Sequence, residues 1–392
     1  MFFAIEIFFW ICVAGIFHTY ILYPFLLKLA SVGKKQNSVI YTPQDDNLPH
    51  VSVIIAAYNE EEVIEKKIQS IFATHYPAHL LEVHIGSDNS SDATNEIISA
   101  YAERYDNLFL HAFSTRQGKA AIINTLVQDT SAEVVVLTDA NVFFEYNTLY
   151  ELVKHYKNPD IGLVGGYIVN TNIKKNGISY QEKTYLSHEN LLKYREGIVW
   201  GAMIGAFGGV YSIRKKYYSP VPGNYFMDDF YITMSVLRQR KKAIAELDAV
   251  CYEDISNIMH EEFRRKIRIS IGNFQNLSTF GHMACNLTSG IGFSFFSHKV
   301  LRWITPFLLI DSLLCSAILF SQDIVYSYMF FGQIILLLFP VIDMLLKKMN
   351  IHISILRFIT HFYSMNIALL IGFFKFLKGV ESNVWQPTKR NQ

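Results

Sequence analysis

Acidic side chains stand directly after short apolar runs in the first half of the chain. Asp88 follows the run that begins at Leu81, and Asp139 follows the run Val134–Leu137. A carboxylate at the end of a buried strand is costly unless it is paired or bound to a cation. Mg²⁺ needs only one or two carboxylates when phosphate oxygens complete its shell. The placement therefore predicts a divalent ion at Asp139, close to a phosphorylated ligand.

Other residues at the same strand ends suit a nucleotide. Tyr58 and Glu60 follow the apolar run Val51–Ala57, and Asp88 has a carboxylate that can accept hydrogen bonds from a base or ribose. Lys119 follows a glycine, so a cation lies beside flexible backbone, which suits a diphosphate. For Asp88 taken alone, a helix cap or a turn fits as well.

A second group of candidates lies further along the chain. Small residues run from Gly205 and Ala206 to Gly209, and they would let a substrate approach the backbone, although a tight turn explains them too. Asp228 and Asp229 open an amphipathic stretch. Carboxylates suit a helix N-terminus, and a positioned carboxylate can also take the proton of an attacking alcohol.

Three arginines then share one face of an expected helix. Arg264, Arg265 and Arg268 are spaced by one, three and four residues. This cluster suits a diphosphate, because each guanidinium group can bind two phosphate oxygens at once. Anionic lipid headgroups are the alternative ligand, since apolar segments follow.

The elements that must position these residues alternate along the chain. Short β-branched runs alternate with amphipathic stretches from residue 51 onward, which predicts an α/β fold with a mostly parallel sheet. Ligands bind at the carboxyl ends of such strands. The expected strands are Val51–Ala57, Leu81–Ile85, Leu108–Ala112 and Val134–Leu137, and the expected helices are Glu61–Phe72, Asp92–Arg104, Lys119–Val127 and Asp228–Leu237.

Apolar residues, 51% of the chain, concentrate at its two ends. Ile7–Leu27 carries no charge and is long enough to cross a bilayer. No basic residue precedes it, which favours an anchor over a signal peptide. Lys28, Lys34 and Lys35 follow, so the next segment is expected in the cytoplasm.

Three further spans are expected near the other end, at Trp303–Phe320, Ile324–Leu346 and Ile353–Leu377. Four crossings would place the tail outside, whereas Lys389 and Arg390 favour the inside, so a re-entrant or interfacial segment stays an alternative. The expected regions are a membrane helix at 1–31, a sheet domain at 49–281, a membrane region at 282–378 and a polar tail at 379–392.

Composition excludes several classes of protein. A net charge of +1 without a basic stripe argues against a nucleic-acid partner. The four cysteines are scattered and form no CxxC pair, so neither a zinc site nor a disulfide scaffold is expected.

Taken in order, these motifs resemble family 2 glycosyltransferases of the GT-A fold, of the membrane type that includes cellulose, hyaluronan and poly-N-acetylglucosamine synthases. The resemblance covers about residues 49–281. It implies that Asp139 and Asn141 bind Mg²⁺ or Mn²⁺, and that Asp229 of the acidic pair is the catalytic base. Further nucleotide-sugar-binding residues implied are Ala57, Tyr58, Glu60, Asp88 and Lys119.

The resemblance implies an inverting transfer from a nucleotide-sugar, expected to be a UDP-hexose or UDP-N-acetylhexosamine. The acceptor would be a membrane-associated saccharide or lipid-linked molecule, used in cell-surface polysaccharide synthesis at the cytoplasmic face of a bacterial inner membrane. Arg265 and Ile269 replace the Gln and Trp of the processive synthase motif, which argues against long chains. A processive synthase and an inactive nucleotide-sugar-binding assembly subunit are the alternatives.

Overall fold

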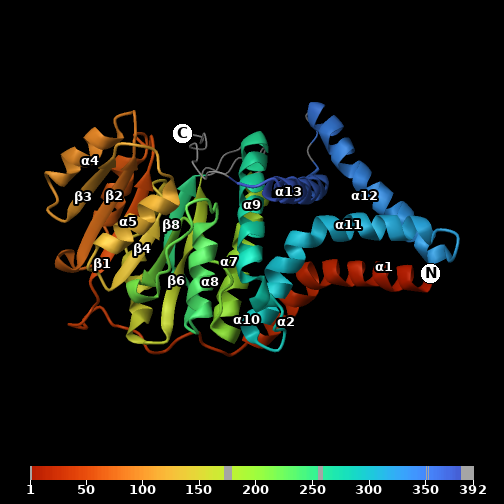
Figure 1. Cartoon of the computed structure of the whole chain (residues 1–392), viewed down its shortest axis with the longest axis horizontal. Coiled ribbons are helices and arrows are strands. Elements are labelled where there is room, and N and C mark those ends of the chain that lie inside the picture. Colours follow the sequence, from red (N-terminus) through yellow and green to blue (C-terminus); the bar gives the residue numbers. More distant parts are fainter. Residues whose placement is uncertain (1, 172–178, 255–258, 350, 352, 381–392) are drawn as a thin grey trace. The chain divides into compact units, whose positions relative to one another are not determined.

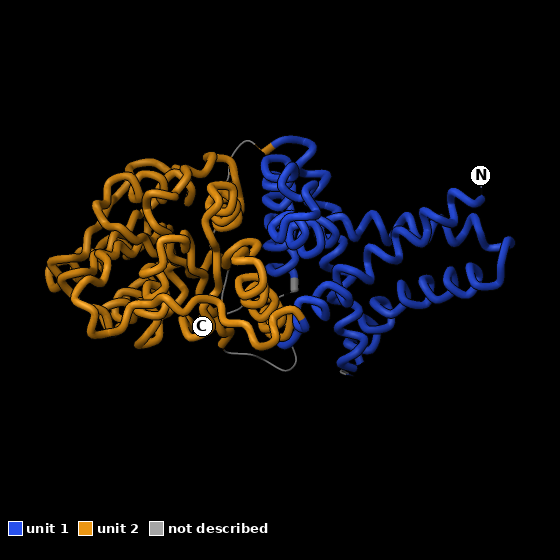
Figure 2. The backbone as a smooth tube through the Cα atoms, turned by 90° about the horizontal axis from the view of Figure 1, so that it is seen from below, with its two compact units in different colours: residues 1–29, 174–182, 257–379 blue, residues 30–173, 183–256, 380–392 orange. Residues whose placement is uncertain are grey.

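The computed structural model describes residues 2–171, 179–254, 259–349, 351 and 353–380, and it divides into two compact units. Unit 1 comprises residues 1–29, 174–182 and 257–379, and unit 2 comprises residues 30–173, 183–256 and 380–392 (Figure 2). The predicted polar tail, apart from residues 379 and 380, lies outside the described residues.

Unit 2 is built on one mixed sheet of eight strands in the order β3-β2-β1-β4-β7-β6-β8-β5 (Figure 1). Only β7 and β5 run against the other six strands of this sheet in the described residues, so the prediction of a mostly parallel α/β sheet is confirmed. The strands are β1 Val51–Ala57, β2 Leu81–Asp88, β3 Leu108–Phe113, β4 Val134–Thr138, β5 Val142–Phe144, β6 Ile161–Thr171, β7 Val210–Arg214 and β8 Lys242–Asp254.

Helices alternate with these strands, as the sequence pattern predicts. The predicted helix from Glu61 begins later, at Ile64, because residues 61–63 form a turn in which Val63 and Ile64 donate to the carbonyl of Glu60. The α-helices are α3 Ile64–Phe72, α4 Thr94–Ala102, α5 Lys119–Asp129, α6 Thr148–Val153, α7 Ser179–Trp200 (which begins in unit 1) and α8 Asp228–Arg238. Short 3₁₀ segments lie at Ala78–Leu80, Lys154–Lys157 and Lys215–Tyr217.

The core of unit 2 explains why these runs are so apolar. Central parallel strands are covered on both faces, so β1 and β4 are buried almost without interruption. Helix α3 turns Ile64, Ile68 and Ile71 onto the sheet, at the spacing of four and three that marks one helix face. Because these strands are held in the core, the polar residues at their carboxyl ends lie at fixed positions along the edge of the sheet.

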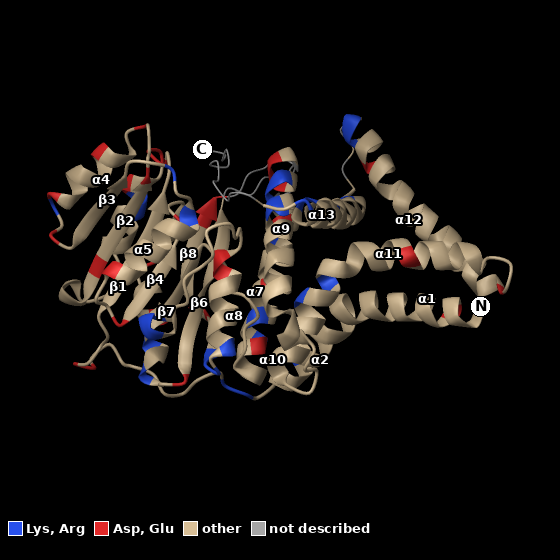
Figure 3. Ribbon diagram, in the orientation of Figure 1, with Lys and Arg blue, Asp and Glu red and all other residues tan. Residues whose placement is uncertain are grey.

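Unit 1 is helical. Among the described residues four helical stretches are long and apolar enough to cross a membrane: Phe2–Ser31, Gly290–Ile318, Ile324–Lys348 and Ser354–Leu377. Figure 3 shows how few charged residues α1, α11 and α12 carry. The elements are α1 Phe2–Phe17, a π segment His18–Leu22, α2 Tyr23–Ser31, α9 Met259–Ala284, α10 Gly290–Ser294, a π segment Phe295–Val300, α11 Leu301–Ile318, α12 Ile324–Lys348 and α13 Ser354–Leu377.

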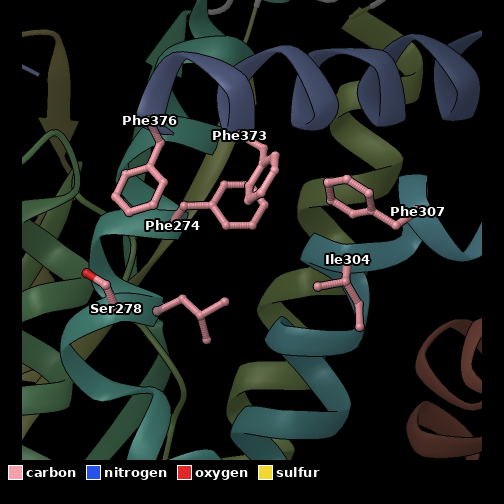
Figure 4. A pocket seen from close by; sticks show the side chains of 7 residues that line it. Phe274, Ser278, Ile304, Phe307, Phe373 and Phe376 are labelled. Carbon is pink, nitrogen blue, oxygen red and sulfur yellow. The ribbon is translucent and has the colours of Figure 1, made fainter. Parts of the chain in front are cut away.

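Helix α9 groups with these helices and not with the sheet, so the unit boundary near residue 256 differs from the predicted domain end at 281. The reason is close packing on α13. Ser270 donates to the carbonyl of Leu369 at 2.9 Å, and a Cβ at Gly372 would lie 2.3 Å from Ser270. Helices α9, α11 and α13 also line an apolar pocket of about 430 Å³, with Phe274, Phe307 and Phe373 around it (Figure 4).

Candidate active site

The carboxyl ends of β1, β2 and β4 lie at one edge of the sheet, and the reversed strand β7 begins there. The backbone amide of Asp139, just after β4, donates to the carbonyl of Gly209 at 3.2 Å. The Thr138 hydroxyl donates to the same carbonyl at 2.7 Å. The end of β4 and the small-residue segment before β7 are therefore fixed to each other.

Lys119 joins two of the predicted site carboxylates. Its Nζ lies 2.8 Å from Oδ1 of Asp139 and 3.5 Å from Oδ2 of Asp228. Burial acts to lower the pKa of Lys119, but the carboxylates of Asp139 and Asp228 outweigh it and hold that pKa above its usual range. The structure thus brings together residues from α5, β4 and α8, which are distant in sequence.

Asp229 lies next to this ion-pair cluster and is almost fully buried, with 7% of its surface exposed. Its Oδ1 accepts the amide of Phe230 at 2.7 Å, at the N-terminus of α8. Burial and the neighbouring charge of Asp228 raise the pKa of Asp229 to about 6, against the opposing effect of Lys119. A carboxyl group with such a pKa suits a general base near neutral pH.

Two buried polar atoms of this site accept or donate no hydrogen bond among the described residues. They are Oδ2 of Asp228 and the hydroxyl of Tyr211 on β7. Burial and the charges of Asp228 and Asp229 raise the pKa of Tyr211 well above its usual value, so this phenol stays neutral. Oδ2 of Asp228 still has the 3.5 Å ion pair with Lys119, whereas the Tyr211 hydroxyl has no partner among the described residues, and buried polar groups rarely remain so without a ligand.

The oxygen atoms gathered here fit Mg²⁺ or Mn²⁺. Asp139 and Asp228, which share Lys119 as a partner, supply carboxylate oxygens, the donors that hard cations prefer. The Asn141 amide nitrogen donates to Glu253 at 3.3 Å, which leaves its carbonyl oxygen as the atom suited to an ion. A divalent ion at Asp139 and Asn141 remains a prediction that this donor set supports.

Another carboxylate group, Glu151, Glu246 and Asp248, lies close enough together to hold an ion. Lys154 and His155 already lie against Glu246, at 2.9 and 2.7 Å. This network holds the pKa of Glu246 at about 2, through His155 and Lys154 against the effect of burial. Lys154 pairs with both Glu151 and Glu246, so two of the three carboxylates already have a cationic partner, and we assign no metal to the group.

On the nucleotide side, Asp88 anchors a loop. It is fully buried, and it accepts Arg116 Nε at 3.0 Å and the amides of Gln117 and Gly118 at 2.6 and 3.1 Å. Gly118 has a φ of +86°, a conformation that favours glycine, and α5 begins directly after it. Asp88 thus holds the loop that precedes α5, and its role in nucleotide binding remains a prediction.

Arg116, which the sequence pattern did not single out, also covers Tyr58. Its guanidinium carbon lies 3.3 Å from the centre of the Tyr58 ring, a cation–π arrangement. Ala57 is fully buried, and its contact with a nucleotide remains a prediction. Glu60 is buried too, and its amide donates to Thr94 at 2.9 Å. Tyr58 and Arg116 are therefore the groups of this set best suited to a nucleotide base.

The small-residue segment is tied to α8. Gly205 has a φ of +81°, and a Cβ there would lie 2.5 Å from the Phe230 ring. The amide of Ala206 donates to the Thr233 hydroxyl at 3.0 Å, and that hydroxyl donates to the carbonyl of Asp229 at 2.7 Å. Residues 208 and 209 form a turn, which is the alternative explanation of these small residues, and an acceptor site beside them remains a prediction.

The arginine cluster lies in unit 1, whereas the carboxylates lie in unit 2. On α9, Arg264 pairs with Glu261 at 3.8 Å and Arg265 pairs with Glu262 at 3.3 Å. Contact of Arg264, Arg265 and Arg268 with a diphosphate therefore stays a prediction.

Gly208 offers a direct test of how Asp229 is placed. A Cβ at Gly208 would lie 3.1 Å from Oδ2 of Asp229, so the carboxylate must move by a few tenths of an ångström. We expect Gly208→Ala to lower kcat by roughly 3- to 10-fold, because misplaced catalytic groups lose rate steeply. Gly223→Ala is the control, since nothing lies within 4 Å of a Cβ there. Equal activity of the two variants would contradict this placement.

The fold and the site together define a class, the α/β domains of GT-A type with carboxylates at the ends of parallel strands. Residues 52–218 match the family described as "Glycosyl transferase family 2". The chain therefore contains a family 2 glycosyltransferase domain, as its motifs predict.

Individual proteins agree with this assignment. The chain is 33% identical over 132 residues to a beta-monoglucosyldiacylglycerol synthase of Trichormus variabilis, covering 33% of this chain and 28% of that protein. It is 28% identical over 183 residues to a poly-beta-1,6-N-acetyl-D-glucosamine synthase of Staphylococcus epidermidis, covering 46% and 42%. The chain thus spans less than half the length of these relatives.

A solved structure resembles the chain over most of its length. It is the mannosyltransferase PcManGT from Pyrobaculum calidifontis in complex with GDP-Man and Mn²⁺. The TM-score is 0.71 at 21% identity, and the match covers 95% of this chain and 99% of that one. At this identity the likeness establishes the fold, which is the predicted GT-A fold.

Proposed function

We propose that this protein transfers a sugar from a nucleotide-sugar to an acceptor hydroxyl, with inversion at the anomeric carbon. The observation that carries the proposal is the cluster of Asp139, Asp228, Asp229 and Lys119 at one sheet edge. Asp229 would accept the proton of the acceptor hydroxyl as its oxygen attacks the anomeric carbon. The nucleoside diphosphate leaves from the opposite side, so no covalent intermediate with the protein forms.

Lys119 and the metal-binding residues would serve the leaving group. A divalent ion held by Asp139 and Asn141 would neutralise charge on the diphosphate. Lys119 adds an ammonium group at the same place, directed at Asp139. Electrostatic stabilisation by fixed groups is the largest contribution in many enzymes, and these fixed charges support it here.

The donor we propose is a UDP-hexose or UDP-N-acetylhexosamine. Tyr58 and Arg116 offer a stacking surface for the nucleoside. Asp88 binds Arg116 and so keeps the adjacent loop rigid. The similarity to a poly-N-acetylglucosamine synthase and to a glycolipid synthase supports an acceptor that is a saccharide or a lipid-linked molecule. Arg265 and Ile269, which depart from the processive motif, favour the addition of one or few sugars.

The four apolar helices support attachment to a membrane. Lys28, Lys34 and Lys35 directly after the first of them favour a cytoplasmic unit 2 at a bacterial inner membrane. Nucleotide-sugars and Mg²⁺ are both present on that side. Cell-surface polysaccharide synthesis is the process in which such a reaction would belong.

The test uses the full chain in detergent with Mg²⁺ or Mn²⁺, membrane lipid extract and a panel of UDP-, GDP- and dTDP-sugars. We expect metal-dependent release of the nucleoside diphosphate from one UDP-sugar, and a product one or few sugars longer than its acceptor. A long polymer would instead favour the processive synthase. If no donor releases its nucleoside diphosphate while the nucleotides still bind, the inactive assembly subunit is favoured.

A further inference from the structure

Helix α3 carries a lysine that is completely enclosed by the protein. Lys67 has none of its surface exposed, and its Nζ donates to the Thr138 hydroxyl at 2.8 Å and to the carbonyl of Val142. The same Nζ lies 3.8 Å from the centre of the Phe144 ring. Throughout the described part of the chain, Lys67 forms no ion pair with a carboxylate within 4 Å.

A buried ammonium group without a carboxylate partner is unfavourable. Burial lowers the pKa of Lys67 to about 7, although Cys251 and the charge of Asp139 act to raise it. An apolar side chain of the same length would fill this place at less cost to stability. The lysine therefore needs a reason beyond packing, and its two hydrogen-bond partners indicate one.

The two partners of Lys67 flank the predicted metal-binding turn. Thr138 precedes Asp139, and Val142 follows Asn141. Within the turn, the amide of Val142 donates to the carbonyl of Asp139 at 3.3 Å. One ammonium group thus binds both ends of a segment whose middle carries the two proposed ligands.

The contacts continue from the turn to the rest of the site. Besides accepting from Lys67, the Thr138 hydroxyl donates to the carbonyl of Gly209 at 2.7 Å. Gly209 follows Gly208, whose backbone lies against the Asp229 carboxylate. Lys67 therefore lies at the start of a chain of contacts from the metal-binding turn to the segment beside the proposed base.

We propose that Lys67 is a positioning residue, which fixes the turn between Thr138 and Val142 so that Asp139 and Asn141 meet a divalent cation in the geometry it requires. This inference rests on the metal-binding role proposed for Asp139. Lys67 itself touches neither ion nor substrate. Hydrogen-bond partners behind metal ligands typically change metal affinity by about 10- to 100-fold.

The primary test is Mn²⁺ binding to the full chain in detergent, measured as free Mn²⁺ by electron paramagnetic resonance with and without UDP, which supplies phosphate oxygens but no sugar to transfer. We expect Lys67→Met to weaken Mn²⁺ binding by about 10- to 100-fold. Lys66→Met is the control, because Lys66 is the adjacent residue on α3 and is exposed, and its Nζ lies 4.3 Å from the centre of the Phe143 ring, outside the segment Thr138–Val142. It should bind Mn²⁺ as the wild type does.

A second control separates positioning from general stability. Ile68 is fully buried on the same helix, so Ile68→Ala lowers the stability of the fold without removing either hydrogen bond from Lys67 to the turn. We expect Ile68→Ala to keep its Mn²⁺ affinity. If Ile68→Ala loses as much affinity as Lys67→Met, or if Lys67→Met loses none, the positioning role is overturned.

Thr138→Val provides an independent route, which also serves if Lys67→Met does not fold. It removes the hydroxyl that Lys67 binds, and it should weaken Mn²⁺ binding by itself. In the double variant the two losses should be less than additive, because both changes release the same end of the turn. Additive losses would contradict the proposal.

A wild type that binds no Mn²⁺, or an Asp139→Ala variant that still binds it, would overturn the metal role of Asp139 as well.

Discussion

Replacing Asp229 with asparagine is expected to lower kcat for sugar transfer by about 10²- to 10⁴-fold, the range for a lost general base. The amide keeps the shape of the carboxylate and can still accept from the Phe230 amide, but it cannot take a proton. Nucleotide affinity should change little, because Asp229 is assigned to the acceptor hydroxyl. Steady-state kinetics and nucleotide binding, measured on the same preparation, check both statements.

Asp160→Asn is the matched control for this change, since the Asp160 side chain is 60% exposed and contacts only surface lysines among the described residues. It should keep full activity. An Asp229→Asn variant with more than a tenth of wild-type kcat would rule out Asp229 as the base.

The same group should set the acid limb of the pH profile. Because only ionised Asp229 can accept a proton, and its pKa is raised to about 6, kcat should fall as pH drops through 6 and level off above it. The native state also holds this proton more tightly than the unfolded chain. Its contribution to stability therefore declines as pH rises from about 4 to 6. An unchanged acid limb in Asp229→Asn would assign the titration to another group.

Replacing Asp139 with alanine is the second change with a large expected effect. We expect at least a 10²-fold loss of metal-dependent activity, because the variant loses a carboxylate ligand of the ion that stabilises the leaving diphosphate. Lys119 also loses its partner at 2.8 Å, so its charge remains beside Asp228 alone. The measurement is a Mn²⁺ titration of activity together with direct Mn²⁺ binding.

Asp248→Ala is the control for Asp139→Ala, because Asp248 belongs to the other carboxylate group that could hold an ion. It should retain both binding and activity. If Asp248→Ala loses the metal and Asp139→Ala does not, the ion belongs to the group of Glu151, Glu246 and Asp248.

The local pattern of apolar and polar residues was sufficient to predict half of the strands of the sheet and the positions of several site residues. The apolar runs of β1, β2 and β4 are bounded by polar residues, so the strands could be predicted, but β2 continues beyond its predicted end at Ile85 to Asp88. Since parallel strands end at a common edge, Asp88 and Asp139 could be expected at one side. The pairing of Lys119 with Asp139 and Asp228 could not, because it depends on where α5 and α8 lie on the sheet.

Lys67 shows most clearly what the sequence pattern alone could not predict. In the sequence it stands beside Lys66 in a helix with charged neighbours, a pattern typical of an exposed face. The two lysines differ only once the sheet is formed, because helical rotation turns one toward Thr138 and the other to solvent. Similarly, α9 reads as an amphipathic helix, and only its contact with α13 places it in unit 1.

The strand order has a consequence for how the protein acquires its native state during synthesis. Strand β4 pairs with β7, and β5 pairs with β8, whose partner residues emerge from the ribosome many tens of residues later. Contacts between distant parts of a chain form slowly. Strand β5 lies at the sheet edge beside β8, so the segment Val142–Phe144 must wait, without a strand partner, until Glu253 has been made. A nascent chain stalled earlier would already hold β1, β2 and β3 in register, yet it would lack an assembled catalytic centre.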